Sequence, residues 1–208
     1  VRGLQKEGYH KPSPIQARAI PIGRFGADLI AQAKSGTGKT CMFAAIVLDA
    51  LNLDLRHPQA IIVSPTRELA HQTRDVVRGI GSFMPGMVCH AFVGGLSTTE
   101  DVSLLQGGQA YCQICAGTPG RLRALLEMGA LACEGVRQVV LDEADELLAE
   151  AFKAQVSILL SALPARKQVV AVSATYTPEL LATVRALTRD PQEVLLTTNA
   201  TASLQGVA

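Results

Sequence analysis

Ala33-Lys34-Ser35-Gly36-Thr37-Gly38-Lys39-Thr40 lies directly after the apolar run Asp28–Ala31 and before a stretch that suits a helix, Thr40–Leu51. Glycines in such a loop let the backbone bend closely enough to aim several N–H groups at phosphate oxygens, at the positive end of the following helix. The pattern is that of a P-loop, except that Ala33 stands where the strict pattern has glycine. The stretch therefore predicts a bound nucleoside triphosphate.

Two side chains of this loop have expected roles at the phosphates. Lys39 is expected to reach the β- and γ-phosphates, and the Thr40 hydroxyl to ligate Mg²⁺. A tight strand-to-helix turn without a ligand would explain the glycines but not the adjoining Lys-Thr pair. We therefore predict that the loop binds the nucleotide through Lys34, Ser35, Gly36, Thr37, Gly38, Lys39 and Thr40.

The same strand-then-helix order repeats along the whole chain. Repetition of this kind predicts an α/β fold with a doubly wound, mostly parallel sheet and helices on both faces. Strands are expected at Asp28–Ala31, Ala60–Val63, Val88–Val93, Gln113–Ala116, Val139–Leu141, Val169–Val172 and Val194–Leu196. Helices are expected near Thr40–Leu51, Arg67–Ile80, Thr98–Leu105, Gly120–Glu127, Glu143–Leu163 and Pro178–Thr188.

Every unusual polar cluster follows one of the expected strands. In open α/β sheets, ligands bind beyond the carboxyl ends of the strands, so the clusters predict one extended active face. The P-loop follows the first strand. The next five strands are followed in turn by Pro65–Ala70, Gly94-Gly95, Thr118–Arg121, Asp142–Asp145 and Ser173–Thr175.

The composition is that of a globular protein. The chain has 208 residues, 48% of them hydrophobic, which suits one domain with a real core and excludes a disordered chain. The net charge is +1, so a nucleic-acid surface would have to be a local groove. No apolar run approaches the roughly 20 residues that cross a bilayer, so we expect no membrane partner. We expect a single domain over residues 1–196, and a linker or disordered tail over 197–208.

Cysteines and histidines give weaker signals. Cys112 and Cys115 form a C-x-x-C pattern, which can mark zinc or redox chemistry. No second ligand pair stands at a suitable spacing, and positions i and i+3 of a strand face opposite ways, so we interpret both as packing residues. Cys41, Cys89 and Cys133 complete an odd number without a disulfide-framework spacing, so reduced thiols are expected. Surface or packing roles are expected for His10, His57, His71 and His90.

Asp142 and Glu143 supply two carboxylates with separable roles beside a triphosphate. Asp142 is expected to hold Mg²⁺, directly or through water, and Glu143 to polarise the attacking water. Acidic residues also open helices, where they complement the helix dipole. That alternative explains Glu143 by itself but not its combination with the P-loop, so catalytic roles are predicted for Glu143, Asp142 and Lys39.

The motifs together resemble the N-terminal RecA-like domain of DEAD-box RNA helicases, over essentially the whole chain. Asp142-Glu143-Ala144-Asp145 spells the name of that family. Gly8-Tyr9 and Pro12, leading to Ile15-Gln16, resemble the adenine-recognising Q motif. Because the other clusters follow in the family's order, the resemblance is specific.

This resemblance implies roles for further residues. Tyr9 would stack on adenine, Gln16 would hydrogen-bond its edge, and Lys11 would join the nucleotide site. Ser173 and Thr175, with Asp145, would couple the nucleotide state to strand separation. The RNA backbone would contact Pro65, Thr66, Arg67, Gly94, Gly95, Thr118, Pro119, Gly120 and Arg121.

Some of these roles have alternatives. For Arg67 and Arg121, a salt bridge to Glu68 or to another carboxylate is an equal alternative to an RNA contact. Ser173 and Thr175 could be ordinary capping groups before Pro178. Hydroxyl, guanidinium and backbone N–H groups suit phosphates and 2′-hydroxyls, so binding without base specificity is expected.

The resemblance also implies partners. DEAD-box helicases carry a second RecA-like domain with the arginines that stabilise the transferring phosphoryl group, and the resemblance leads us to expect that this domain is missing from the chain. Such arginines are worth about 10³–10⁵ in rate, so the isolated chain should bind ATP but hydrolyse it poorly. The stretch Ala19–Ile30 and its continuation are similar to the Gemin-type helicase, which implies subunits of the survival-of-motor-neuron complex as partners and small nuclear ribonucleoprotein assembly. We expect a location in the cytoplasm, the nucleus or both.

Two other classes of function remain open. A P-loop NTPase of another class, such as a DNA translocase or a transporter ATPase, would lack the preference for adenine that Tyr9 and Gln16 predict. A binding scaffold with a vestigial nucleotide site would lack turnover. Intact Lys39, Thr40 and Glu143 favour an enzyme.

Overall fold

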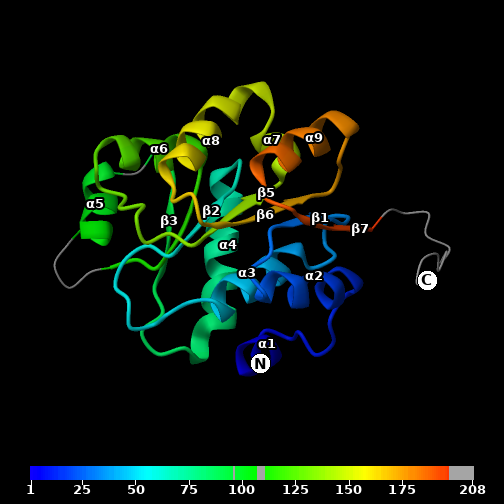
Figure 1. Ribbon diagram of the computed structural model, residues 1–208. Helices are drawn as coiled ribbons and strands as arrows, with labels where there is room; N and C mark the ends of the chain where they lie inside the picture. The colour runs from blue at the N-terminus through cyan, green and yellow to red at the C-terminus, as the bar shows by residue number, and fades with distance from the viewer. Residues whose placement is uncertain (96, 107–110, 197–208) are drawn as a thin grey trace, which may run out of the picture.

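A seven-stranded sheet runs through the middle of the computed structural model, which describes residues 1–95, 97–106 and 111–196 (Figure 1). The strand order is β3-β4-β2-β5-β6-β1-β7, and all six pairings of neighbours are parallel. This arrangement confirms the predicted α/β fold. The strands are β1 Leu29–Gln32, β2 Ala60–Val63, β3 Cys89–Phe92, β4 Ile114–Gly117, β5 Gln138–Asp142, β6 Gln168–Ser173 and β7 Gln192–Leu195.

The strands read as apolar runs because they are covered on both faces. Every residue of β2, β4, β5 and β6 is buried, as is typical of parallel sheets between helical layers. Each expected strand is present, with boundaries that differ by at most two residues. Adjacent side chains serve different cores: Ile62 packs in the core below the sheet and Ile61 in the core above it.

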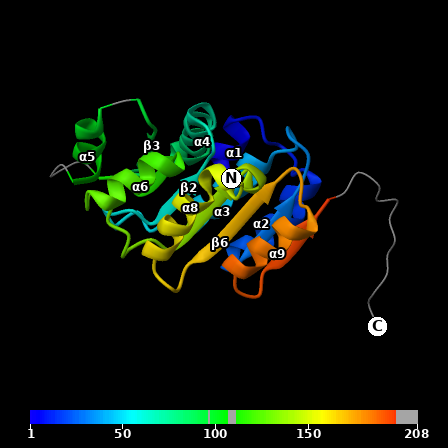
Figure 2. The ribbon, with the colours of Figure 1, turned by 90° about the horizontal axis from the view of Figure 1, so that it is seen from above.

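Helices form one layer on each side of the sheet (Figures 1 and 2). The lower layer holds the N-terminal helices and the upper layer holds the later ones. Below lie α1 Arg2–Lys6, α2 Pro14–Arg24, α3 Lys39–Asp49 and α4 Arg67–Ile80. Above lie α5 Thr98–Gln106, α6 Pro119–Glu127, α7 Ala144–Leu147, α8 Glu150–Ala162 and α9 Pro178–Leu187.

Two helical predictions were incomplete. Helix α2 was not predicted, although Ser13 and Gln16 form a capping box at its start and Pro14 occupies its first turn. The single helix expected over Glu143–Leu163 was wrong. Ala149 adopts extended backbone between α7 and α8, which lets α8 change direction and pack against α6.

The expectation that Cys112 and Cys115 face opposite ways was also wrong. Their sulfur atoms lie 3.7 Å apart in the upper core. Cys112 precedes β4 and does not follow its two-residue alternation, so both thiols reach the same side. All five cysteines are buried and free, and burial raises the pKa of Cys41 and of Cys133 to about 11.

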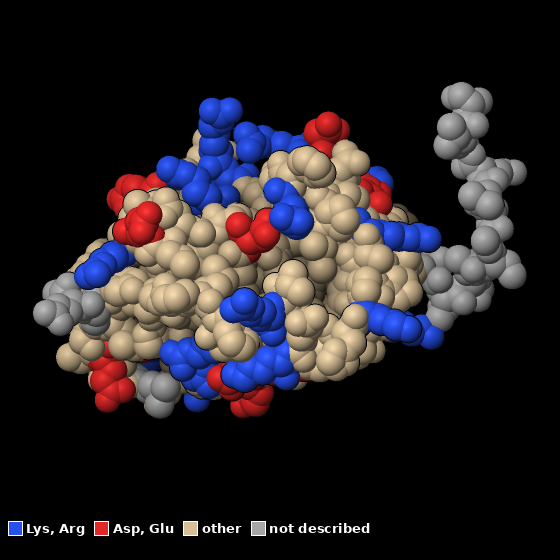
Figure 3. Space-filling view, turned by 90° about the horizontal axis from the view of Figure 1, so that it is seen from below, with Lys and Arg blue, Asp and Glu red and all other residues tan. Residues whose placement is uncertain are grey.

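Other expectations concern charge, metals and the tail. In Figure 3, basic and acidic side chains are interspersed on the lower face, without a continuous field of one sign. Within the described ranges, no group of three or more His, Cys, Asp or Glu side chains could hold a metal ion, and no helix is long and apolar enough to cross a membrane. The predicted tail, residues 197–208, lies outside the described residues.

Candidate active site and nucleic-acid interface

The strand order divides the carboxyl edge of the sheet into two neighbouring regions. Because all strands are parallel, their carboxyl ends lie along one edge, as the polar clusters predicted. The P-loop, the Ser173–Thr175 cluster and the acidic cluster follow β1, β6 and β5, which are adjacent. The clusters after β2, β4 and β3 form the other region, and β2 borders β5.

The P-loop has the backbone that its glycines require. Gly36 and Gly38 have φ values of 77° and 89°, a region that favours glycine because it has no Cβ. The Thr37 hydroxyl donates to the Lys34 carbonyl over 2.6 Å, which closes the loop on itself. Helix α3 then begins at Lys39, so its free N–H groups face the loop.

Lys39 joins the P-loop to the acidic cluster. Its Nζ atom lies 3.3 Å from both carboxylate oxygens of Glu143, and its side chain is only 6% exposed. Glu143 has φ 51° and ψ 60°, a left-handed conformation that costs a residue with a side chain about 1–3 kcal/mol. This strained backbone aims the carboxylate at the phosphate-binding loop.

Asp142 ends β5 beside this pair and is 4% exposed. Burial raises the pKa of its carboxyl to about 7; the negative charge of Glu143 adds to this effect, whereas Lys39 opposes it. The carboxylates of Asp142 and Glu143 therefore both lie beside the Lys39 ammonium. Carboxylate and hydroxyl oxygens are the ligands that Mg²⁺ prefers, and Asp142 and Thr40 supply one of each.

Gln16 ties the N-terminal segment to the P-loop. Its side-chain oxygen accepts from the Ser13 N–H over 2.9 Å, and its amide nitrogen donates to the Gly38 carbonyl over 3.1 Å. A Cβ at Gly38 would lie 3.3 Å from Gln16 Cδ and would collide with the amide nitrogen. The side-chain oxygen of Gln16 can accept one more hydrogen bond, and its amide nitrogen can donate one more. Gln16 lines a pocket of about 220 Å³ together with Tyr9 and Lys11.

The cluster after β6 contacts the acidic cluster directly. The Thr175 hydroxyl donates to Asp145 Oδ2 over 2.7 Å. The Ser173 hydroxyl donates to the Thr175 carbonyl over 2.7 Å and accepts from the Thr175 N–H over 3.1 Å. Gln32, just before the P-loop, donates to the Ala174 carbonyl over 3.3 Å. Of the three residues predicted to couple nucleotide to strand separation, Thr175 thus contacts both Asp145 and Ser173, and the cluster is joined to the end of β1 through Ala174.

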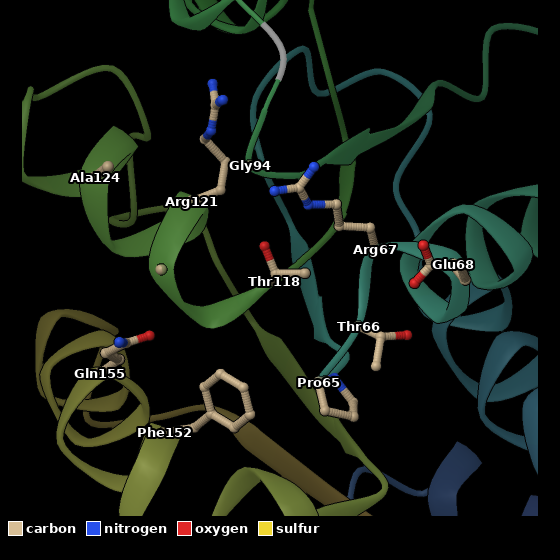
Figure 4. A pocket seen from close by; sticks show the side chains of 11 residues that line it. Pro65, Thr66, Arg67, Glu68, Gly94, Thr118, Arg121, Ala124, Phe152 and Gln155 are labelled. Carbon is tan, nitrogen blue, oxygen red and sulfur yellow. The ribbon is translucent and has the colours of Figure 1, made fainter.

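The second region forms an open pocket of about 660 Å³ (Figure 4). Seven of the nine residues predicted to contact RNA line it: Pro65, Thr66, Arg67, Gly94, Thr118, Gly120 and Arg121. Gly95 and Pro119 do not. The pocket begins where β2, β3 and β4 end, so helices α4 and α6 point their first turns into it. Such turns present free N–H groups, which suit phosphate.

Arg67 rests on the paired glycines. A Cβ at Gly94 would lie 3.6 Å from Arg67 Nη2, and a Cβ at Gly95 would lie 3.0 Å from Arg67 Cζ and overlap Nη1. Gly95 also has φ 88°. Figure 4 shows the Arg67 guanidinium extending across the pocket toward Gly94. Because Gly95 has no side chain, there is room for the Arg67 guanidinium at this place.

Arg121 is held differently. Its Nη1 donates to Asp101 Oδ2 over 2.8 Å, and both side chains are buried. Burial raises the pKa of Asp101, although the charge of Arg121 acts in the opposite direction. Figure 4 shows Arg121 directed away from Arg67. The sequence did not indicate which carboxylate could pair with Arg121, and the structure shows that it is that of Asp101 in α5.

Sequence reasoning missed part of the pocket wall. Ala124 of α6 and Phe152 and Gln155 of α8 line it, as does Glu68, which was considered only as an ion partner. No motif marks Phe152 or Gln155, because they reach the pocket only through the packing of α8 against α6.

Comparisons with known proteins agree with this geometry. A family model described as DEAD/DEAH box helicase matches residues 13–184. The mouse (Mus musculus) protein "Probable ATP-dependent RNA helicase DDX20" is 48% identical over 200 residues, which are 94% of this chain and 23% of that protein. "ATP-dependent RNA helicase eIF4A" of Pyricularia oryzae is 42% identical over 196 residues, which are 94% of this chain and 48% of that protein. The chain spans less than half the length of these two relatives.

Solved structures share the fold. Dbp5 of S. cerevisiae, bound to RNA and ADP BeF3, matches with a TM-score of 0.86 and 31% identity, over 95% of this chain and 49% of that chain. A DEAD box protein from the hyperthermophile Methanococcus jannaschii matches with a TM-score of 0.88 and 30% identity, over 95% of this chain and 53% of that chain.

Proposed function

Since the chain belongs to the DEAD/DEAH box helicase family, we propose that it is the ATP-binding half of an ATP-dependent RNA helicase or ribonucleoprotein-remodelling ATPase. In this role it binds ATP with Mg²⁺ and holds part of the RNA backbone. Support comes from the relatives named as ATP-dependent RNA helicases and from a similar structure that holds RNA and ADP BeF3.

The contact between Lys39 and Glu143 carries this proposal. It joins residues 104 positions apart and brings the phosphate-binding loop to the carboxylates. In the chain without nucleotide, Lys39 neutralises Glu143. Phosphate oxygens of an entering triphosphate compete for Lys39, and Glu143 is then released to accept a proton from the attacking water.

Mg²⁺ fits the residues present. The raised pKa of Asp142 means that the protein alone does not compensate its negative charge. We expect Asp142 and Thr40 to hold the ion, which would neutralise charge on the triphosphate. Removal of Mg²⁺ should therefore weaken ATP binding.

RNA is expected in the second region, beside the nucleotide. Arg67 and the first turns of α4 and α6 offer donors to phosphate oxygens, which carry no sequence information. The Thr175–Asp145 contact joins the cluster after β6 to the acidic cluster, and the resemblance implies that it couples the nucleotide state to strand separation. The family's second RecA-like domain would supply the arginines that stabilise the transferring phosphoryl group.

Substitution of Glu143 tests the assignment in the full-length protein. Glu143→Gln keeps the size of the side chain but removes the base, so we expect ATP binding to persist and RNA-stimulated hydrolysis to be abolished. Steady-state hydrolysis with and without RNA, together with a nucleotide titration, measures both. Unchanged turnover would show that Glu143 is not the base, and a wild-type protein without turnover would favour a scaffold.

A nucleotide titration tests the choice of ATP over GTP. Gln16 has a free donor and acceptor site at the pocket shared with Tyr9 and Lys11. We expect ATP to bind more tightly than GTP in the wild type, and Gln16→Ala to reduce the difference. Equal binding of the two nucleotides would favour a P-loop NTPase of another class.

A finer proposal concerns the cellular role. The similarity of Ala19–Ile30 to the Gemin-type helicase and the 48% identity to the mouse relative support small nuclear ribonucleoprotein assembly with subunits of the survival-of-motor-neuron complex. The corresponding location is the cytoplasm, the nucleus or both. Co-purification of the tagged full-length protein with those subunits, and imaging of the same protein, would test the two statements.

A further inference from the structure

Helix α4 carries a stripe of basic side chains that leads away from the 660 Å³ pocket. The stripe consists of Arg67, His71, Arg74 and Arg78. Spacings of four, three and four residues place these side chains on one face of the helix. Arg67 lines the pocket, but the other three residues do not. Because the helix rises about 16 Å from Arg67 to Arg78, the stripe extends well beyond the pocket.

The stripe follows the free edge of the sheet. Among the described residues, β3 is an outermost strand and pairs with β4 alone. Just beyond its carboxyl end, a Cβ at Gly94 would lie 3.6 Å from Arg67 Nη2. At its amino end, Arg78 Nε donates to the Cys89 carbonyl over 2.7 Å. The two arginines therefore lie at opposite ends of β3, and the stripe borders the whole strand.

The two arginines beyond the pocket act on the same part of β3. Arg78 Nη2 lies 3.3 Å from His90 Nδ1. Burial lowers the pKa of His90, and the positive charges of Arg78 and Arg74 lower it further. Both guanidinium groups are therefore close to His90, and together they make this part of the sheet edge positive.

Both arginines keep hydrogen-bond donors for a ligand. Arg74 contacts Asp75 through Nε and Nη2, each at 2.8 Å, and Arg78 uses Nε and Nη2 on β3. In the described part of the chain, Nη1 of each arginine has no hydrogen-bond partner. Asp75 is 62% exposed, and exposed ion pairs are weak, so phosphate oxygens can compete with it for Arg74.

Continuity with the pocket favours a nucleic-acid strand as the ligand of this stripe. Arg67 belongs both to the stripe and to the pocket in which the RNA backbone is expected. A guanidinium binds phosphate oxygens in a bidentate manner and does not depend on the base sequence. A strand that leaves the pocket beside Arg67 meets Arg74 and Arg78 next, whereas an acidic protein segment would have no such connection to a bound ligand.

We propose that a single-stranded RNA held in the pocket continues along α4, where Arg74 and Arg78 bind its phosphates. The inference rests on the proposed function, because it assumes that RNA occupies the pocket. It adds a contact region outside the polar clusters that follow the strands, and no sequence motif marked it. At the spacing of stacked nucleotides, about 3.4 Å, the stripe accommodates up to about five nucleotides.

Oligouridines of increasing length test the proposal in the full-length protein with a non-hydrolysable ATP analogue. Arg78→Met keeps the apolar stem of the side chain but removes the charge. We expect unchanged affinity for an oligouridine that fills only the pocket, and an affinity about fivefold weaker for a longer one, the upper range for one exposed charge pair. The rise of affinity with length should stop up to about five nucleotides earlier than in the wild type.

Arg74→Gln repeats the test without removing a contact to β3. Because Arg78 also binds a backbone carbonyl of β3, this second variant separates a lost phosphate contact from a displaced strand. With the longer oligouridine, each variant should lower the slope of log K against log salt by about 0.7, and the double variant by about 1.4. Arg166→Met is the matched control, since Arg166 is exposed and precedes β6 at the amino edge of the sheet; it should change neither affinity nor slope.

Three outcomes would overturn the proposal: wild-type affinity for the longer oligouridine in both variants, equal losses for short and long oligouridines, or an equal loss in Arg166→Met. A labelled polyglutamate peptide that binds the wild type but not Arg78→Met, with RNA affinity unchanged, would assign the stripe to an acidic protein segment instead. Failure of the proposed function is a different result. In that case the wild-type protein would bind no oligouridine of any length with the ATP analogue, and RNA would not stimulate its ATP hydrolysis.

Discussion

Gly95→Ala tests whether Gly95 positions the Arg67 guanidinium for RNA binding, provided that the general cost of an alanine at a positive φ is measured separately. Gly95 has φ 88°, where an alanine costs about 1–2 kcal/mol. A new Cβ would lie 3.0 Å from Arg67 Cζ, against an ordinary contact distance of about 3.5 Å. The guanidinium must therefore move by about 0.5 Å or more, away from the position that faces the pocket.

The expected effect on RNA follows from the loss of one charged contact. A hydrogen bond to a charged group is worth about 1.5–3 kcal/mol, so RNA affinity should fall about tenfold or more. The dependence of binding on salt should weaken as well, by about 0.7 in the slope of log K against log salt for one phosphate contact on a single strand. Fluorescence anisotropy of a labelled oligouridine, with the full-length protein and an ATP analogue, measures both quantities.

Gly26→Ala provides the matched control. Gly26 has φ 79°, has open space where the Cβ would stand, and precedes β1 at the opposite edge of the sheet. It should lose similar stability without losing RNA affinity. If Gly95→Ala loses stability like the control but keeps the wild-type affinity and salt slope, Gly95 does not place Arg67 on a phosphate. In an Arg67→Met background, Gly95→Ala should have no further effect on RNA binding.

Three other substitutions test charge and burial. The pKa of Asp142 is raised to about 7, so above about pH 4 the folded chain keeps a proton that the unfolded chain has lost. As the pH rises from 5 to 8 without Mg²⁺, the wild type should therefore lose a few kcal/mol of stability relative to Asp142→Asn. Equal changes of melting temperature with pH in the two proteins would contradict this. Asp101→Asn removes the buried ion partner of Arg121 and should cost about 3–5 kcal/mol in chemical denaturation, whereas a loss below about 1 kcal/mol, typical of an exposed ion pair, would show that the pair is dispensable. Tyr176→Phe removes a buried hydroxyl without a partner among the described residues, so its melting temperature should equal or exceed that of the wild type; a lower temperature would reveal a hidden partner.

The sequence predicted the fold well because its signals are local. The buried strands read as short apolar runs, and the P-loop shows its glycines directly. The helix break at Ala149 was missed, since neither glycine nor proline marks it; the break serves the packing of α8 on α6. The direction of the Cys112 side chain was predicted wrongly, because Cys112 lies outside β4 and does not follow the alternation of that strand.

For the site, the sequence identified the groups and the structure supplied their partners. The P-loop, the carboxylates and most of the pocket residues were predicted by number, since each follows a strand of a parallel sheet, whereas Tyr9, Lys11 and Gln16 were named from the family resemblance. Whether Arg121 meets RNA or a carboxylate remained open until α5 placed Asp101 beside it. Gln155 gave no signal, because a glutamine in a helix is ordinary until its neighbours exclude water.

The sequence by itself determined which chemical groups stand at the carboxyl ends of the strands, because a loop's glycines, hydroxyls and carboxylates are fixed by adjacent positions in the chain. Only the tertiary structure decided which groups are neighbours. The order β3-β4-β2-β5-β6-β1-β7 places Lys39 against Glu143 and gathers the clusters after β2, β3 and β4 into one pocket. Strand order depends on contacts between distant segments, which burial and packing select and which no local pattern records.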